Sequence, residues 1–257
     1  MNFRRLALAL MLLCTPLPIA AADLAAHSAV YELNLVKARG DVSGATGTMS
    51  YDVVDACDGW TVHQRLAMTI TNSDGQDVDV LSEYTTYERK NGESLSFRSR
   101  QMTGRTTTSE VVGEAQMTAD GGEVKYAIPE GSVKKLSRGT LFPMAHTDAI
   151  LTAALAGKKF VEVPLFDGTG AEGAQSTSVA ISGISSRMPS RWAGLADLPS
   201  VRVHVAFFDQ DVGAQQPDYE VTIRYWMNGI ADDLEMDFGD FIMRGRLTTL
   251  TVGASKC

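Results

Sequence analysis

Short stretches of alternating apolar and polar residues, separated by Asx-Gly dipeptides, recur along most of the chain. Such alternation places one set of side chains on each face of a β-strand. The dipeptides favour the left-handed backbone of tight hairpin turns, and they begin at Asp58, Asp74, Asn91, Asp120, Asp167 and Asn228. The pattern therefore predicts a largely antiparallel, all-β protein.

The spacing of the alternating stretches indicates an open, barrel-like sheet. Many strands carry Thr, Ser or charged residues at every second position, so we expect one face of most strands to meet water or a ligand. The strands are predicted at residues 29–36, 48–54, 60–71, 78–87, 94–102, 123–128, 160–165, 176–184, 201–208 and 241–252, with two more in the hairpin around residue 228.

The Asn228-Gly229 hairpin allows its register to be predicted. A two-residue turn would set Tyr225 opposite Asp232 and Arg224 opposite Asp233. The apolar residues of both strands then share one face, and Trp226 lies with Arg224 on the charged face. A slip of one residue would destroy this match.

One segment, residues 143–156, departs from the alternating pattern and is predicted to be a helix. Pro143 stands near its first position and Gly157 follows its end, as is typical of helix boundaries. At 100° per residue, one stripe would contain Met144, Thr147, Ile150, Leu151, Ala154 and Leu155. Such a helix either covers the core or forms a lid over a ligand cavity, and both interpretations stay open.

The first residues have the form of an export signal. Arg4 and Arg5 precede an apolar run over residues 6–13, and the small residues 20–22 resemble a signal-peptidase site. We therefore expect residues 1–22 to be a signal peptide that is removed, and residues 23–257 to form a single soluble domain. The apolar run is too short to span a bilayer, because about 20 apolar residues are needed, so a chain that spans no membrane is expected.

Charge argues against nucleic acid as a partner. The chain of 257 residues has 23 Lys and Arg against 31 Asp and Glu. Removing Arg4 and Arg5 with the signal leaves 21 − 31 = −10, which repels a phosphate backbone. We expect a monomer.

Cys57 and Cys257 are the cysteines that remain once Cys14 leaves with the signal. In an oxidising compartment, two thiols without a competitor have one intramolecular way to pair. They form no Cys-x-x-Cys motif, so a structural disulfide is favoured over a redox or metal site.

Two basic clusters stand out against the acidic background. They contain Lys134, Lys135 and Arg138 in one segment, and Arg187, Arg191 and Trp192 in another. Each is either a solvated turn or a contact site for anionic lipid headgroups or a partner protein.

Motifs of enzymes are nearly absent. Ser132 and Lys135 satisfy Ser-x-x-Lys, but the companion motifs of penicillin-binding proteins are missing. His146 and Asp148 would diverge by about 200° on a helix. His27, His63 and His204 fall in separate segments, so the sequence predicts no catalytic residue, no metal site and no cofactor.

An acidic stripe, Asp233, Glu235 and Asp237, follows one strand of the predicted hairpin. Successive carboxylates on one face of a strand lie about 7 Å apart, whereas calcium needs oxygens converging at about 2.3–2.6 Å from the ion. A solvated outer face is the favoured interpretation.

An ordered set of short motifs resembles the envelope-integrity protein B family of periplasmic proteins from Gram-negative bacteria. The motifs run from Cys57-Asp58-Gly59-Trp60 through Leu141-Phe142-Pro143 and the segments 224–230 and 236–241 to Cys257. The resemblance implies a β-spiral, a disulfide between Cys57 and Cys257, a role in cell-envelope homeostasis and a periplasmic tetratricopeptide-repeat protein as a partner. It supplies no catalytic residues.

The sequence thus favours a non-enzymatic periplasmic protein that supports envelope integrity through protein or ligand binding. A periplasmic carrier that holds a lipid or peptide in its concave sheet is the alternative, since it would need an apolar cavity of several hundred cubic ångströms. An unrecognised hydrolase ranks third.

Overall fold

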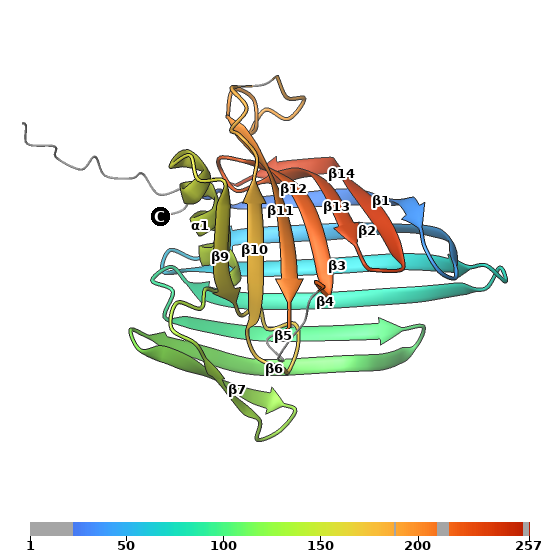
Figure 1. Ribbon diagram of the computed structural model, residues 1–257, viewed down its shortest axis with the longest axis horizontal. Coiled ribbons are helices and arrows are strands. Elements are labelled where there is room, and N and C mark those ends of the chain that lie inside the picture. The colour runs from blue at the N-terminus through green and yellow to red at the C-terminus, as the bar shows by residue number, and fades with distance from the viewer. Residues whose placement is uncertain (1–22, 188, 210–215, 254–256) are drawn as a thin grey trace, which may run out of the picture.

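One curved antiparallel sheet and one helix make up the structure, a computed structural model that describes residues 23–187, 189–209, 216–253 and 257 (Figure 1). The sheet has 14 strands and is not closed into a barrel. The predicted export signal lies outside the described residues. In the part of the chain that the structure describes, no helix is long and apolar enough to cross a membrane.

The first half of the chain builds outward from the middle of the sheet to one edge. Each strand pairs with the strand before it. The strands are β1 (His27–Ala38), β2 (Val42–Asp55), β3 (Gly59–Asn72), β4 (Asp77–Arg89), β5 (Ser94–Thr103), β6 (Thr106–Thr118), β7 (Gly121–Ile128) and the edge strand β8 (Val133–Leu136).

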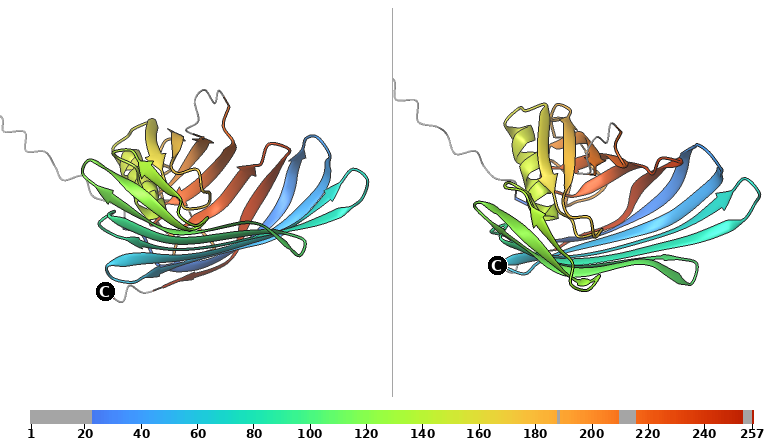
Figure 2. Two further views of the ribbon diagram at one scale, coloured as in Figure 1. Left: turned by 90° about the horizontal axis from the view of Figure 1, so that it is seen from below. Right: turned by 60° about the horizontal axis from the view of Figure 1, so that its bottom comes forward.

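The second half starts at the opposite edge and returns to the middle. Helix α1 (Pro143–Leu155) connects the two halves, and β14 finally pairs with β1. The strands are β9 (Phe160–Leu165), β10 (Gln175–Ile181), β11 (Ser200–Phe208), β12 (Tyr219–Trp226), β13 (Ala231–Asp237) and β14 (Phe241–Val252). The sheet curls, so that the late strands cross in front of the long early ones (Figures 1 and 2).

The all-β, barrel-like fold with one helix confirms the prediction. Two strands, β6 and β8, were not predicted. The first residues of β6, from Thr106 to Ser109, are all exposed, because this end of the strand extends past the core. Without a buried face, the segment lacks the alternation by which a strand is recognised.

The predicted hairpin register is confirmed away from the turn. Arg224 lies opposite Asp233, but Tyr225 lies opposite Ala231, because a bulge at Asp232 shifts the register. The Trp226 N–H donates to the Ile230 carbonyl at 2.9 Å, so the connection has three residues. The predicted two-residue turn was wrong.

Trp226 was also placed on the wrong kind of surface. Its side chain is 2% exposed and belongs to the main hydrophobic cluster, as does Leu195 from the connection between β10 and β11. The Met227 N–H donates to the Pro199 carbonyl at 3.0 Å. This connection therefore packs beside the hairpin and covers a position that would otherwise be solvated.

Helix α1 lies within one residue of its predicted end and has Gly157 in the left-handed conformation (φ +74°). Ile150 and Leu151 are buried in the main cluster, as predicted. Leu155, by contrast, is 46% exposed, and His146 is buried in its place. The helix faces the sheet over a stripe that is rotated toward His146.

Candidate functional site

A partly open cavity of about 350 Å³ lies between the two halves of the sheet, beneath the N-terminal turn of α1. Its size falls in the range of about 300–1,000 Å³ that is usual for small-molecule sites. Its lining includes His27, Tyr31, Met49, Tyr51, Gln64, Ser82, Tyr84, His146, Thr147, Asp167, Tyr219, Val221, Ile223, Tyr225, Leu234 and Met236.

The early strands give the cavity a polar wall. Tyr51 on β2, Gln64 on β3 and Tyr84 on β4 occupy successive opposed positions, and Ser82 continues this wall along β4. Because alternate residues of a strand face the same side, these hydroxyl and amide groups line one surface. The late strands bring mainly aliphatic side chains to the opposite surface, including Ile223 on β12 and Leu234 on β13.

Some of the tyrosine hydroxyls in the cavity are already engaged. The Tyr31 hydroxyl donates to the Ala231 carbonyl at 2.7 Å, and the Tyr84 hydroxyl donates to the Asp167 carbonyl. Among the described residues, no partner accepts from the hydroxyl of Tyr51 or Tyr219, although both residues line the cavity. Burial raises the pKa of both hydroxyls above the usual value, so they remain protonated donors.

No lysine or arginine is found among the described residues that line the cavity. Burial lowers the pKa of His146 to about 4, and it also lowers that of His27. Both imidazoles are therefore uncharged near neutral pH. The Nε2 of His146 lies 2.9 Å from the Thr177 hydroxyl, and the Nδ1 of His27 lies 2.8 Å from the Ala25 carbonyl oxygen. The interior holds hydrogen-bonding groups without positive charge.

A buried carboxylate joins β4 to the start of α1. Glu88 is 2% exposed and accepts from the backbone N–H groups of Met144 at 2.7 Å and Ala145 at 2.8 Å. The N-cap residue Phe142 provides no side-chain bond, so Glu88 satisfies donors that every helix leaves unpaired. Desolvation raises its pKa to about 7 against the effect of these hydrogen bonds. Glu88 thereby holds the helix over the cavity.

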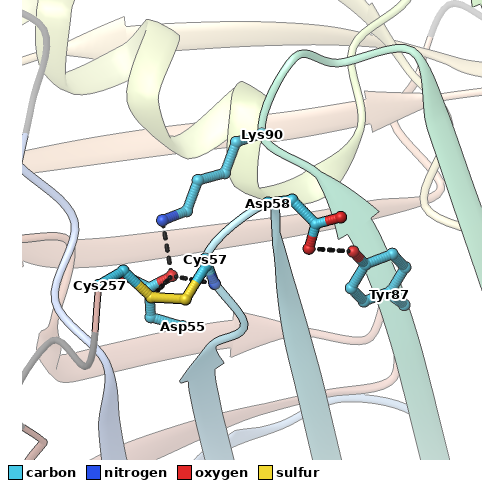
Figure 3. Close-up of a disulfide and its surroundings, with 6 residues drawn as sticks. All are labelled: Asp55, Cys57, Asp58, Tyr87, Lys90 and Cys257. Carbon is cyan, nitrogen blue, oxygen red and sulfur yellow. Dashed lines mark hydrogen bonds and ion pairs between the residues drawn. A yellow bond between two sulfur atoms is a disulfide. The ribbon is translucent and has the colours of Figure 1, made fainter.

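The structure contains the disulfide that the sequence predicts. Cys57, at the turn between β2 and β3, is bonded to Cys257 with the Cα atoms 5.4 Å apart (Figure 3). Asp55 accepts from the Cys57 backbone N–H at 2.9 Å and from Lys90 at 2.6 Å. Lys90 also lies 4.5 Å from the centre of the Trp60 ring. The disulfide ties the end of the chain to the early hairpins.

The first predicted basic cluster lies at the free edge of the sheet. Lys134 and Lys135 are exposed residues of β8, and exposed Arg138 follows that strand. The second cluster belongs to a different segment, between β10 and β11. There Arg191 stacks on Trp192 with its Cζ 4.7 Å from the ring centre and donates to the Leu247 carbonyl, while Arg187 is exposed. The role of either cluster in binding stays a prediction.

The acidic stripe on β13 lies among arginines. Asp233 lies 2.9 Å from Arg202, and Glu235 lies 2.8 Å from Arg244. Arg224, which the predicted register set against Asp233, instead forms a two-pronged ion pair with Asp232 at 2.7 and 2.9 Å. Within the described ranges, no three His, Cys, Asp or Glu side chains are grouped to hold a metal ion.

Sequence reasoning missed the cavity wall and Glu88. The signal was present on β4, where Ser82, Tyr84, Thr86 and Glu88 recur with a period of two. A period of two normally marks a buried apolar face. Here the inward face is polar, so the alternation by itself did not show which side of β4 lines the interior.

A sheet that curls around its own interior without closing defines an open, barrel-like all-β protein. A family model described as EipB-like matches residues 18–254, and the chain belongs to this family. The cell envelope integrity protein EipB of Brucella abortus (strain 2308) is 32% identical over 242 residues, covering 90% of this chain and 85% of that protein.

The fold is also similar to a solved structure. The crystal structure of a beta-barrel-like protein of a domain of unknown function, also from Brucella abortus, aligns with a TM-score of 0.84 at 28% identity. The alignment covers 91% of this chain and 100% of the other. The predicted resemblance to the envelope-integrity protein B family is thus confirmed.

Proposed function

We propose that this protein is exported to the periplasm and supports the integrity of the cell envelope by binding, without catalysing a reaction. Its similarity over 90% of the chain to a protein named for cell envelope integrity carries the proposal. The disulfide between Cys57 and Cys257 supports an oxidising compartment.

Deletion and complementation in the native host test this role. We expect deletion to increase sensitivity to a detergent such as deoxycholate, and the full-length gene to restore resistance. A copy without residues 2–22, expressed to the same level, should not restore it, because its product would stay in the cytoplasm. Equal rescue by both copies would contradict export as a requirement.

Partner binding is the favoured mode of action, with a periplasmic tetratricopeptide-repeat protein as the expected partner. The exposed cations Lys134, Lys135 and Arg138 at the sheet edge are one proposed contact, and Arg187, Arg191 and Trp192 are the other. Crosslinking in the periplasm followed by mass spectrometry should identify the partner. A Lys134→Glu/Lys135→Glu variant should lose the crosslink if the edge is the contact, and an unchanged crosslink would exclude this edge.

A carrier of lipid or peptide is the second candidate, and the cavity of about 350 Å³ beneath α1 favours it. Native mass spectrometry of protein purified from the periplasm, before and after solvent extraction, tests this function. A stoichiometric mass that disappears on extraction would support a carrier. An unliganded mass in both samples would leave partner binding as the mode of action.

A further inference from the structure

The unlike walls of the cavity indicate what kind of molecule it accepts. We propose that the cavity binds one uncharged acyl chain, whose ester or amide carbonyl accepts a hydrogen bond from Tyr51 on the polar wall. The ligand class is a neutral monoacyl lipid. This inference rests on the proposed ligand-binding role and names its ligand.

The size and the aliphatic wall favour a single chain. At about 350 Å³, the cavity lies near the lower end of the volumes seen for small-molecule sites. Val221, Ile223, Leu234 and Met236 present an aliphatic surface from β12 and β13, on which methylene groups lose contact with water. Each methylene that enters should raise the affinity about fourfold, which corresponds to ~0.8 kcal/mol.

The absence of cationic side chains from the described lining argues against an anionic ligand. A buried carboxylate or phosphate without a cation is strongly unfavourable. His27 and His146 do not supply the charge, because each stays neutral near pH 7. An uncharged ester or amide requires only a hydrogen-bond donor.

The donors for such a carbonyl are present. Tyr51 and Tyr219 line the cavity, and their hydroxyls have no acceptor among the described residues. A peptide would also bring an N–H group at nearly every residue, and these groups would face the aliphatic side chains of β12 and β13 unpaired. One carbonyl attached to a long apolar chain matches the two walls better.

Titration calorimetry of the full mature chain with defined probes tests the inference. Monolaurin has an uncharged ester head, whereas laurate has the same chain with an anionic head. We expect monolaurin to bind with a stoichiometry of one and at least tenfold more tightly than laurate at pH 7.5. Monoglycerides of increasing length should gain affinity up to the chain that fills the cavity, and no further.

Conservative variants locate the site. Tyr51→Phe removes one hydroxyl and should weaken monolaurin binding about fivefold. Tyr87→Phe is the matched control, because the Tyr87 hydroxyl donates to Asp58 at 2.7 Å outside the cavity. It should leave the affinity unchanged. Melting temperatures of both variants establish that they are folded.

Other results would overturn the inference in distinct ways. Laurate binding as tightly as monolaurin would contradict the uncharged class, and equal affinities for Tyr51→Phe and the native chain would remove the tyrosine from recognition. No binding by any probe would end the proposal for this ligand. The proposed envelope role is decided separately by complementation, so the two can fail independently.

Discussion

Strands β4 and β11 face the same interior with opposite chemistry. The inward residues of β4 are Ser82, Tyr84, Thr86 and Glu88. Those of β11 include Val201, Val203 and Val205, which are 1%, 1% and 2% exposed. Strand β4 contributes hydrogen-bonding groups to the interior, and β11 contributes apolar side chains to the hydrophobic core.

This difference separates stability from recognition within a single sheet. The main hydrophobic cluster draws mostly on α1, β1 and β10 to β14, with Ala45 and Met49 of β2 and Met68 of β3, and a second cluster forms around β5 to β8. The early strands are long and mutually hydrogen-bonded, and their curvature brings polar residues against that core. Substitutions should therefore have different effects in the two regions.

The largest loss of stability should come from removing the disulfide that links the two halves of the chain. Replacing Cys57 and Cys257 together by serine should lower the free energy of unfolding by up to about 5 kcal/mol, because the bond closes a very long loop in the unfolded chain. Urea denaturation measures the loss. The control is the native protein treated with reductant, which should unfold at the same urea concentration as the double serine variant. If the double serine variant had the same midpoint as the untreated native protein, the disulfide would contribute nothing to stability.

A core substitution on α1 should cost nearly as much. Leu151 is 0% exposed and lies in the main cluster, so Leu151→Ala should destabilise the protein by about 2–5 kcal/mol. Leu155→Ala on the same helix is the matched control, since Leu155 is 46% exposed, and it should cost less than about 0.5 kcal/mol. Similar losses in both variants would contradict the observed rotation of the helix.

The buried titratable groups Glu88 and His146 should make the stability of the protein depend on pH. Burial raises the pKa of Glu88 from its usual 4.5 to about 7, so the folded chain retains a proton that the unfolded chain releases. Its contribution to stability falls as the pH rises from 4.5 to 7. His146 has a folded pKa of about 4 against 6.5, so its contribution rises with pH over 4–6.5. Each change is roughly 3 kcal/mol.

Two variants separate these opposing contributions. Relative to the native protein, Glu88→Gln should gain stability as the pH is raised from 4.5 to 7, whereas His146→Asn should lose it between pH 4 and 6.5. Denaturation midpoints at half-unit pH intervals give the comparison. Parallel curves for all three proteins would show that neither group titrates with a shifted pKa.

The smallest effect is expected on the outer face. The side chains of Arg224 and Asp232 are 32% and 10% exposed, and a double-mutant cycle should give a coupling of about 0.5–1 kcal/mol. The control pair, Arg65 and Glu83, is separated by 3.8 Å and is about half exposed on both sides, so its coupling should be close to zero. A coupling energy larger than the stability lost in Leu151→Ala would contradict the expectation that interior contacts contribute more than surface ion pairs.

Several local features were predictable from residues close together in the chain. Pro143 and Gly157 bracket α1 because both restrict the backbone at helix ends. The register of Ile223 and Leu234 followed from apolar alternation on both strands. The predicted turn beside them was wrong. Trp226 is buried in one cluster with Leu195, which is distant in sequence, so residues close to the turn did not reveal its surroundings.

The candidate site was not predictable in the same way. Tyr51 on β2 and Ile223 on β12 line the same cavity only because the sheet curls, and no spacing in the sequence encodes this arrangement. Glu88 accepts a hydrogen bond from the Met144 N–H at the start of the helix, although the two residues are 56 positions apart in sequence. Its identity as a helix cap depends on a contact between elements, whereas ordinary N-caps are adjacent in sequence.

The sequence by itself determined the antiparallel strands, the one helix and the pairing of Cys57 with Cys257, because alternation, turn residues and a single available thiol partner act locally or by elimination. Only the tertiary structure decided which face of β4 points inward, which stripe of α1 is buried and where a cavity forms. These depend on how far the sheet curves before the late strands meet the early ones. That curvature is a property of the packed whole, since it is set by the burial of side chains from both halves at once.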